Sequence, residues 1–306
     1  MNALEIILKI RGRFEDIIMR SLAPKVKNVD YVYHYTSIES LLNINNTNEL
    51  WLSHVSYMND PLEIKFGINT IINILEKQKT FKYVPQIIKN NLQTSEQYSL
   101  DLKLDLAFVF SVTELRDNKP FWLQYGNQGK GVSIQFKNHE ILKTLSKYIS
   151  MINMYFPVQY YSNDYLQSDD NITEFEECII EYYKYIESSF DEKELEDINV
   201  QREIFGMSKL LSCFVKNDFY KQEKEWRFAV FAGMGNENVK VISKDDNARM
   251  IYTLCMKNND LFNLIENIQI GPVHNKDTKV TSALELAIYK KQNMFYNIEF
   301  SKGVIK

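Results

Sequence analysis

The stretch YVYHYTSIESLLNINNTNELWLSHVSYMNDPLE, Tyr31–Glu63, decides the fold, because it carries the clearest strand and helix signals of the chain. Its first six residues alternate as a strand does, so His34 and Thr36 share one face. Thr36 and Glu39 have the spacing of a capping box, which predicts the start of a short helix. A histidine at a strand end beside a helix N-terminus is well placed to hold a polar or anionic ligand. A lone histidine is also often a structural hydrogen-bonding group, so both roles stay open.

The second half of this stretch predicts a strand over Leu50–Ser56 and then another helix start. Asp60 is an acidic N-cap, Pro61 suits the first helical position, and Glu63 is the carboxylate expected at N3. This pattern explains Asn59 and Asp60 as parts of a helix cap, and a ligand-binding role for either residue is a separate hypothesis.

The rest of the chain mixes strands and helices without the regular alternation of a doubly wound sheet. We therefore predict an α+β fold, with a mixed central sheet of short strands flanked by helices. Leu106–Val112 is almost wholly apolar and suits a strand buried on both faces. We divide the chain into an N-terminal amphipathic helix and linker, residues 1–30, and a single domain, residues 31–306. The domain contains an acidic helical insertion around residues 164–203.

The composition indicates a globular protein of the cytoplasm. The 306 residues carry a net charge of −4, and 45% of them are hydrophobic. Cys178, Cys213 and Cys255 are odd in number and far apart, which argues against a disulfide framework and favours a reducing compartment. No apolar run approaches the ~20 residues that span a bilayer, so we expect no membrane partner. No dense Lys/Arg run marks a nucleic-acid footprint.

Lys221–Ala232, KQEKEWRFAVFA, is the second informative stretch. If it is a strand, Glu223, Glu225 and Arg227 lie on one face. Two neighbouring carboxylates raise the pKa of one of them unless a cation compensates, and Arg227 can be that cation. Such a carboxylate can stabilise an oxocarbenium-like sugar or bind a ribose hydroxyl. An edge strand with a cross-strand ion pair explains the same spacing.

Several other chemistries lack the residues that they need. Gly126–Gly131 has no Ser or Thr after its lysine, as a phosphate-binding P-loop requires, so a hairpin loop fits it better. Trp122 and Tyr125 can stack on a base or pack in the core. The histidines show no HExxH spacing, so we expect no metal. No GxSxG motif or Cys–His pairing supports a hydrolase.

Five motifs occur in a fixed order along the chain: YHYTS, LWLSHVSYMNDPLE, FWLQYGNQGKGVSIQF, KQEKEWRF and IQIGP. Together they resemble one bacterial family, domain of unknown function 2971, over roughly residues 31–275. The ordered set is more specific than any one motif. The family is known mainly by these motifs, so the resemblance implies membership and no particular activity.

The His-x-Thr on a first strand and the ExE glutamate on a late strand also resemble ADP-ribosyltransferases. This resemblance implies an ADP-ribosyltransferase-like fold, NAD as the substrate, a stacking role for Tyr57 on nicotinamide, and stabilisation of the oxocarbenium ion by Glu225. The catalytic candidates are then Glu225, Glu223 and His34. The NAD-binding candidates are His34, Tyr35, Thr36, Tyr57, Asn59 and Arg227. Tyr35 stands where many transferases have glycine, and no Ser-Thr-Ser motif is present, which also allows a nucleotide-binding fold without transferase activity.

Two classes of function follow from these residues. The first is an enzyme that cleaves NAD and passes ADP-ribose to a protein or nucleic acid, as a toxin or in bacterial stress or phage defence. The second is a non-catalytic module of a defence system that senses a nucleotide or binds nucleic acid, in which Trp122, Tyr125 and Lys130 matter more than Glu225. An operon-encoded partner is a further expectation.

Overall fold

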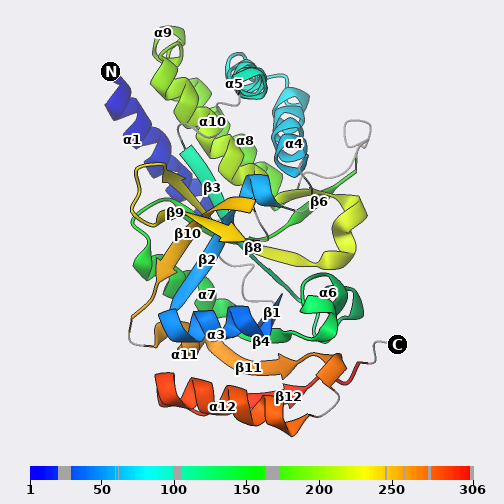
Figure 1. Ribbon diagram of the computed structural model, residues 1–306. Coiled ribbons are helices and arrows are strands. Elements are labelled where there is room, and N and C mark those ends of the chain that lie inside the picture. The colour runs from blue at the N-terminus through cyan, green and yellow to red at the C-terminus, as the bar shows by residue number, and fades with distance from the viewer. Residues whose placement is uncertain are drawn as a thin grey trace.

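The computed structural model describes residues 1–19, 29–58, 60, 62–98, 105–162, 173–244, 247–257, 259–274 and 277–303. It confirms the predicted α+β class, because a mixed sheet lies between two groups of helices (Figure 1).

Within the described residues the main sheet has ten strands. Eight follow one another across it: β12 (Asn297–Phe300), β11 (Ile265–Ile270), β4 (Val132–Lys137), β1 (Tyr31–Thr36), β3 (Asp105–Thr113), β2 (Glu49–His54), β10 (Asn247–Cys255) and β9 (Val239–Lys244). From β3 the sheet also extends through β8 (Glu225–Gly233) to β5 (Asn153–Pro157). Among the described pairs β11 and β12 run parallel and the others antiparallel. A separate parallel pair joins β6 (Gln159–Tyr161) and β7 (Val215–Asn217).

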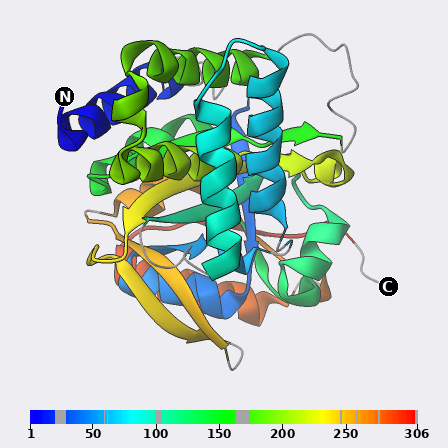
Figure 2. The ribbon, with the colours of Figure 1, turned by 90° about the horizontal axis from the view of Figure 1, so that it is seen from above.

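Helices cover both faces of this sheet (Figure 1 and Figure 2). One group contains α1 (Ala3–Phe14), α4 (Glu63–Lys77), α5 (Val84–Tyr98), α8 (Glu174–Ser189), α9 (Glu192–Leu195) and α10 (Ile198–Ser212). The other contains α3 (Ile38–Thr47), α7 (Asn138–Leu145), α11 (Asp260–Leu264) and α12 (Thr278–Gln292). Along β8, Ala229 and Phe231 face the first group, and Phe228 and Val230 face the second. The strand is therefore buried on both faces.

The N-terminal segment is helical from Ala3 to Met19, the last described residue before position 29. α1 ends at Phe14 and is followed by a π-helical turn over Glu15–Met19. Ile6, Ile10 and Phe14 are buried, and the helix packs against α8 and α10. Residues 20–28 of the expected helix and linker, and residues 163–172 around the acidic insertion, lie outside the described residues.

Both predicted helix starts are shifted along the chain. Ser37, not Thr36, caps α3, because Thr36 stays in β1 and the Ser37 hydroxyl accepts from the Ser40 N–H at 3.0 Å. α4 begins at Glu63, and the Asp60 carboxylate accepts from the Leu62 N–H at 2.9 Å. Asn59 and Pro61 lie outside the described residues.

The sheet separates into two arms beside β3. One edge of β3 pairs with β8 along its whole length. The other edge pairs with β1 at Thr113 and with β2 at Phe108 and Val109. In the part of the chain that the structure describes, no strand pairs with Phe110–Val112 on this edge.

In the described part of the chain, every helix is too short or too polar to cross a membrane.

Candidate functional site

Two adjoining cavities lie where β1 and β2 separate. The outer cavity has a volume of about 480 Å³ and lies between α3, β2 and the β9–β10 hairpin. The inner cavity has a volume of about 180 Å³ and reaches the ends of β3 and β8. His34, Tyr35, Ser53, Tyr57 and Tyr125 line both. The two cavities therefore adjoin and share part of their walls.

His34 is fixed at the junction of the two cavities. Its Nδ1 donates to the carbonyl oxygen of Ser111 at 2.9 Å, across the gap in the sheet. The ring also lies against Phe110, with 4.7 Å between ring centroids. In the neutral imidazole this bond makes Nε2 the acceptor nitrogen. Thr36, two residues further along β1, lines the outer cavity.

Tyr35 contributes to the cavity wall and orders the loop that follows β3. Its hydroxyl donates to the Leu115 carbonyl at 2.8 Å and accepts from the Asn118 N–H at 2.9 Å. Burial raises the pKa of Tyr35 to about 12, so the hydroxyl stays protonated and keeps both bonds at neutral pH. Its role in the structure is to fix the segment after β3 against the end of β1.

Tyr57, the expected stacking residue, lies in the turn η3 (Val55–Tyr57) and is 36% exposed. It borders both cavities, and its ring meets the edge of His54. Asn59 lies outside the described residues. Arg227 lies behind the inner cavity and is 1% exposed, so it acts through its neighbours.

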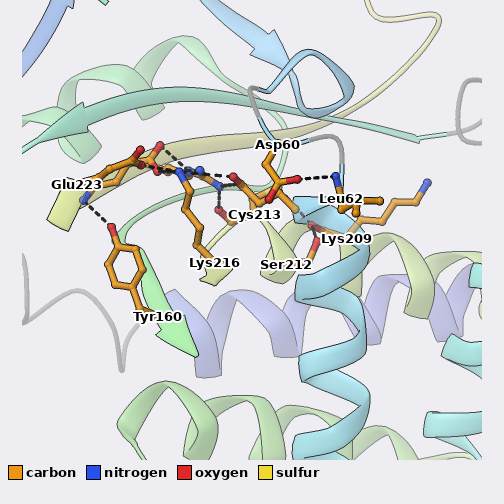
Figure 3. Close-up of polar contacts among 11 residues, drawn as sticks. Asp60, Leu62, Tyr160, Lys209, Ser212, Cys213, Lys216 and Glu223 are labelled. Atoms are coloured by element: carbon orange, nitrogen blue, oxygen red, sulfur yellow. Dashed lines mark hydrogen bonds and ion pairs between the residues drawn. The ribbon is translucent and has the colours of Figure 1, made fainter. Parts of the chain in front are cut away.

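Glu223 and Glu225 contact the ammonium group of Lys216, and all three residues line the inner cavity. Figure 3 shows the side chains of Glu223 and Lys216 together. Lys216 Nζ lies 2.6 Å from Glu223 Oε2 and 3.2 Å from Glu225 Oε2. A third carboxylate, Glu63, is 3.6 Å from the same nitrogen. The three acidic residues come from α4, from the turn before β8 and from β8 itself, and they meet one lysine.

Arg227 holds the other side of this cluster. Its Nε and one terminal nitrogen donate to the two oxygens of Glu225, each at 2.8 Å. Its second terminal nitrogen donates to Glu63 and, at 2.7 Å, to the Cys213 carbonyl. The five side chains form three anions and two cations, so the cluster has one net negative charge. Arg227 and Lys216 share the compensating role that the sequence assigns to Arg227 alone.

The prediction that Glu223, Glu225 and Arg227 share one strand face is wrong for Glu223, which lies in the turn before β8. Asp218–Glu223 forms the 3-10 turn η8, and β8 begins at Glu225. Lys224 between them has a left-handed φ of 44°. The turn brings Glu223 round to Lys216, whereas Glu225 and Arg227 do share a face of β8.

The pKa values of Glu223 and Glu225 are shifted in opposite directions. Burial alone would raise the pKa of Glu225, but Arg227 and Lys216 outweigh burial and lower it to about 2. Burial raises the pKa of Glu223, and Lys216 opposes this only in part. The Glu223 side chain is also the more exposed, 19% against 9%. Glu225 is thus ionised at neutral pH, and Glu223 is the carboxylate closer to protonation.

Trp122 cannot stack on a base. It is 1% exposed, its indole nitrogen donates to Asp117 at 2.8 Å, and its ring meets Tyr35 edge-on. Core packing, the alternative, is the observed role. Tyr125 lines both cavities, whereas Lys130 is exposed and lines neither.

Gly126–Gly131 is a close backbone junction and not a hairpin loop. It links α6 (Lys119–Gln124) to β4 through the turn η5 (Asn127–Gly129). A Cβ on Gly131 would lie far inside van der Waals contact with the Thr36 carbonyl oxygen. A Cβ on Gly271 would meet the Gly129 carbonyl in the same way. The glycines therefore let three backbone segments hold the end of β1 beside the cavities.

Sequence reasoning missed three residues of this site. Glu63 had a complete local explanation as a helix-cap residue, and its contact with Arg227 spans 164 positions of sequence. Lys216 stands in no motif. Trp51 was seen only as part of a strand, yet it is 44% exposed and lines the outer cavity. The alternation of β2 could have placed Trp51 and Ser53 on one face.

A family model described as "Protein of unknown function (DUF2971)" matches residues 121–228. This range contains the FWLQYGNQGKGVSIQF and KQEKEWRF motifs, and YHYTS, LWLSHVSYMNDPLE and IQIGP lie outside it. The chain resembles this family from α6 to the first half of β8. No curated protein and no solved structure matches the chain.

Proposed function

We propose that the protein binds NAD across the two cavities and cleaves the bond between nicotinamide and ribose, passing ADP-ribose to an acceptor. One observation carries this proposal. His34 lines two adjoining cavities, and the lining of the inner one includes a pair of glutamates whose pKa values are shifted in opposite directions. A glycosidic bond that breaks through an oxocarbenium-like transition state needs an anion beside the sugar and a second carboxylate to take a proton.

The two glutamates suit these two roles. Glu225 stays ionised at neutral pH and can stabilise positive charge that develops on the ribose. Glu223 faces the cavity and can accept the proton of the attacking acceptor group as its oxygen or nitrogen bonds to the anomeric carbon. The bonding electrons of the broken C–N bond leave with nicotinamide, which becomes neutral. Charge and protons then balance, with one proton on Glu223.

Release of nicotinamide from NAD, followed by chromatography, tests this proposal without knowledge of the acceptor, because water can serve as one. We expect Glu223→Gln to slow release by about 10²-fold or more, the usual contribution of a general base. Glu140→Gln removes the same charge from an exposed position of α7 and should leave release unchanged. Parent protein that releases no nicotinamide with water, protein or nucleic acid as acceptor would refute the proposal.

A nucleotide-sensing module without catalysis is the second candidate, and the partners of Glu225 favour it. This carboxylate already receives bonds from Arg227, Lys216 and Ser111, which leaves little capacity for a ribose hydroxyl. NAD binding in the absence of any nicotinamide release would select this candidate.

The biological setting belongs to the same proposal. Cys178, Cys213 and Cys255 are free thiols, which supports a reducing cytoplasm. A role in bacterial stress or phage defence, with a protein or nucleic-acid acceptor, is supported by the resemblance of the sequence alone.

A further inference from the structure

Residues of β2, β9 and β10 form one wall of the outer cavity, and the proposed cleavage of NAD uses none of them. In the β2–β10 ladder Trp51 lies opposite Thr253 and Ser53 lies opposite Ile251. In the β9–β10 ladder Arg249 lies opposite Ile242. Directly paired residues point to one side of a sheet, so these side chains share one face. Trp51, Ile251, Arg249 and Ile242 all line the outer cavity.

A second part of the lining is one face of α3. Ser40, Asn43, Ile44 and Thr47 line the cavity and follow the i, i+3, i+4, i+7 spacing of a single helix face. The cavity is therefore a slot lined by hydroxyl and amide groups of a helix and by a tryptophan, aliphatic side chains and an arginine of the sheet. Such a lining suits a flat group with a polar edge.

Trp51 is the large aromatic surface of this slot. It is 44% exposed, whereas Trp122 and Trp226 are 1% and 2% exposed. Its indole nitrogen donates to Glu49 Oε2 at 3.1 Å, which restrains the ring, and the residue lines the cavity. A nucleobase gains affinity by stacking on an aromatic side chain, because every base presents a π-face. An exposed indole in a cavity wall is therefore a natural platform for a base.

Arg249 lies at a suitable distance for a phosphate. It is four residues along β10 from Thr253, the partner of Trp51, which corresponds to about 13 Å at the rise of a strand. Both residues line the outer cavity. A guanidinium group is the preferred bidentate partner of phosphate oxygens. The wall thus presents a stacking surface and a phosphate-binding group in sequence.

We propose that the outer cavity is a nucleoside diphosphate subsite, in which a purine base stacks on Trp51, its edge meets Asn43 on α3, and the phosphates meet Arg249. The proposal rests on the proposed function for the identity of the base, and it assigns the two specificity-determining residues of the adenine half of NAD. A ligand that lacks nicotinamide, such as ADP, should then bind on its own.

Tryptophan fluorescence during titration with ADP tests the subsite directly, because Trp51 is exposed and the other two tryptophans are buried. We expect ADP to quench the emission, and we expect Trp51→Phe to lose the quenching while calorimetry still detects ADP with an affinity within threefold. Trp51→Ala should weaken the binding of ADP at least tenfold. Unquenched emission on saturation, or full ADP affinity in Trp51→Ala, would overturn the proposal.

The phosphate contact has its own matched pair of variants. Arg249→Ala should weaken the binding of ADP at least tenfold and the binding of adenosine less than twofold. Lys143→Ala removes the same charge from an exposed position of α7 that does not line the cavity, and should change neither affinity. Equal weakening by both variants would reduce the effect to long-range charge and overturn the assignment. Tighter binding of single-stranded oligonucleotides than of ADP would likewise overturn it in favour of a nucleic-acid groove.

These results separate the subsite from the reaction. ADP that quenches Trp51 in a protein that releases no nicotinamide would uphold the subsite and refute the transferase. Nicotinamide release that is unaffected by Trp51→Ala and Arg249→Ala would uphold the transferase and refute the subsite.

Discussion

Arg227 and Glu225 depend on each other more than any other pair in the site. Removing the Glu225 carboxylate weakens two charge-assisted hydrogen bonds of the buried Arg227, which keeps Glu63 as its anionic partner, and loss of such bonds to a buried group typically costs about 1–3 kcal/mol. We therefore expect Glu225→Gln to lower the free energy of unfolding by about that amount in urea denaturation at pH 7, because Arg227 is 1% exposed and keeps its charge. Loss of activity in this variant must be measured on protein shown to be folded. A change below about 0.5 kcal/mol would contradict the packing described for Arg227.

The same pair gives a pH dependence with a definite sign. The pKa of Glu225 is lowered from 4.5 to about 2, so its stabilising contribution is fully present above pH 4.5 and is lost as the pH falls towards 2. Glu223 has a raised pKa and contributes in the opposite sense. We expect urea denaturation between pH 5 and pH 3 to show a smaller loss of stability in Glu225→Gln than in the parent. Parallel curves for the two proteins would show that Glu225 titrates normally.

At the scale of the element, the glycine junction sets the position of β1. A methyl group on Gly131 would meet the Thr36 carbonyl, and backbone on both sides prevents easy relaxation. We expect Gly131→Ala to cost about 1–3 kcal/mol or more and to weaken NAD binding, because Thr36 and His34 share that strand. Gly12→Ala in α1 is the control, since nothing lies within 4 Å of its added methyl group. A gain of about 1 kcal/mol is expected there from helix propensity. Thermal unfolding of both variants measures the contrast, and equal stabilities would contradict it.

At the scale of the whole molecule, α1 is part of the main core and not an appendage. Phe14 is fully buried, and its ring meets Tyr182 of α8 edge-on at 5.2 Å. Phe14→Ala should lower the free energy of unfolding by about 3–5 kcal/mol. Circular dichroism and tryptophan fluorescence should show the same single unfolding transition, with a lower midpoint than in the parent. Leu8→Ala, at a position 60% exposed, should change stability by less than about 0.5 kcal/mol. Two separate transitions would show that residues 1–19 fold independently.

The sequence indicates local structure better than it indicates this site. The alternation of Tyr31–Thr36 and the apolar run of β3 follow from side-chain periodicity, which acts over a few residues. Strand order depends on pairings between distant segments, as when β3 lies between β1, β2 and β8. Glu63 and Lys216 join the charge cluster only through such contacts. The His34 and Glu225 motifs could be found early because their residue types are unusual at those positions, whereas the cavity between them exists only in the folded chain.

Calorimetric titration with NAD tests the central claim most directly, with His34→Ala beside the parent protein. We expect the parent to bind NAD, and we expect His34→Ala to bind at least tenfold more weakly while its melting temperature stays close to that of the parent. Absence of binding to the folded parent at millimolar NAD would contradict the claim that the two cavities form an NAD site.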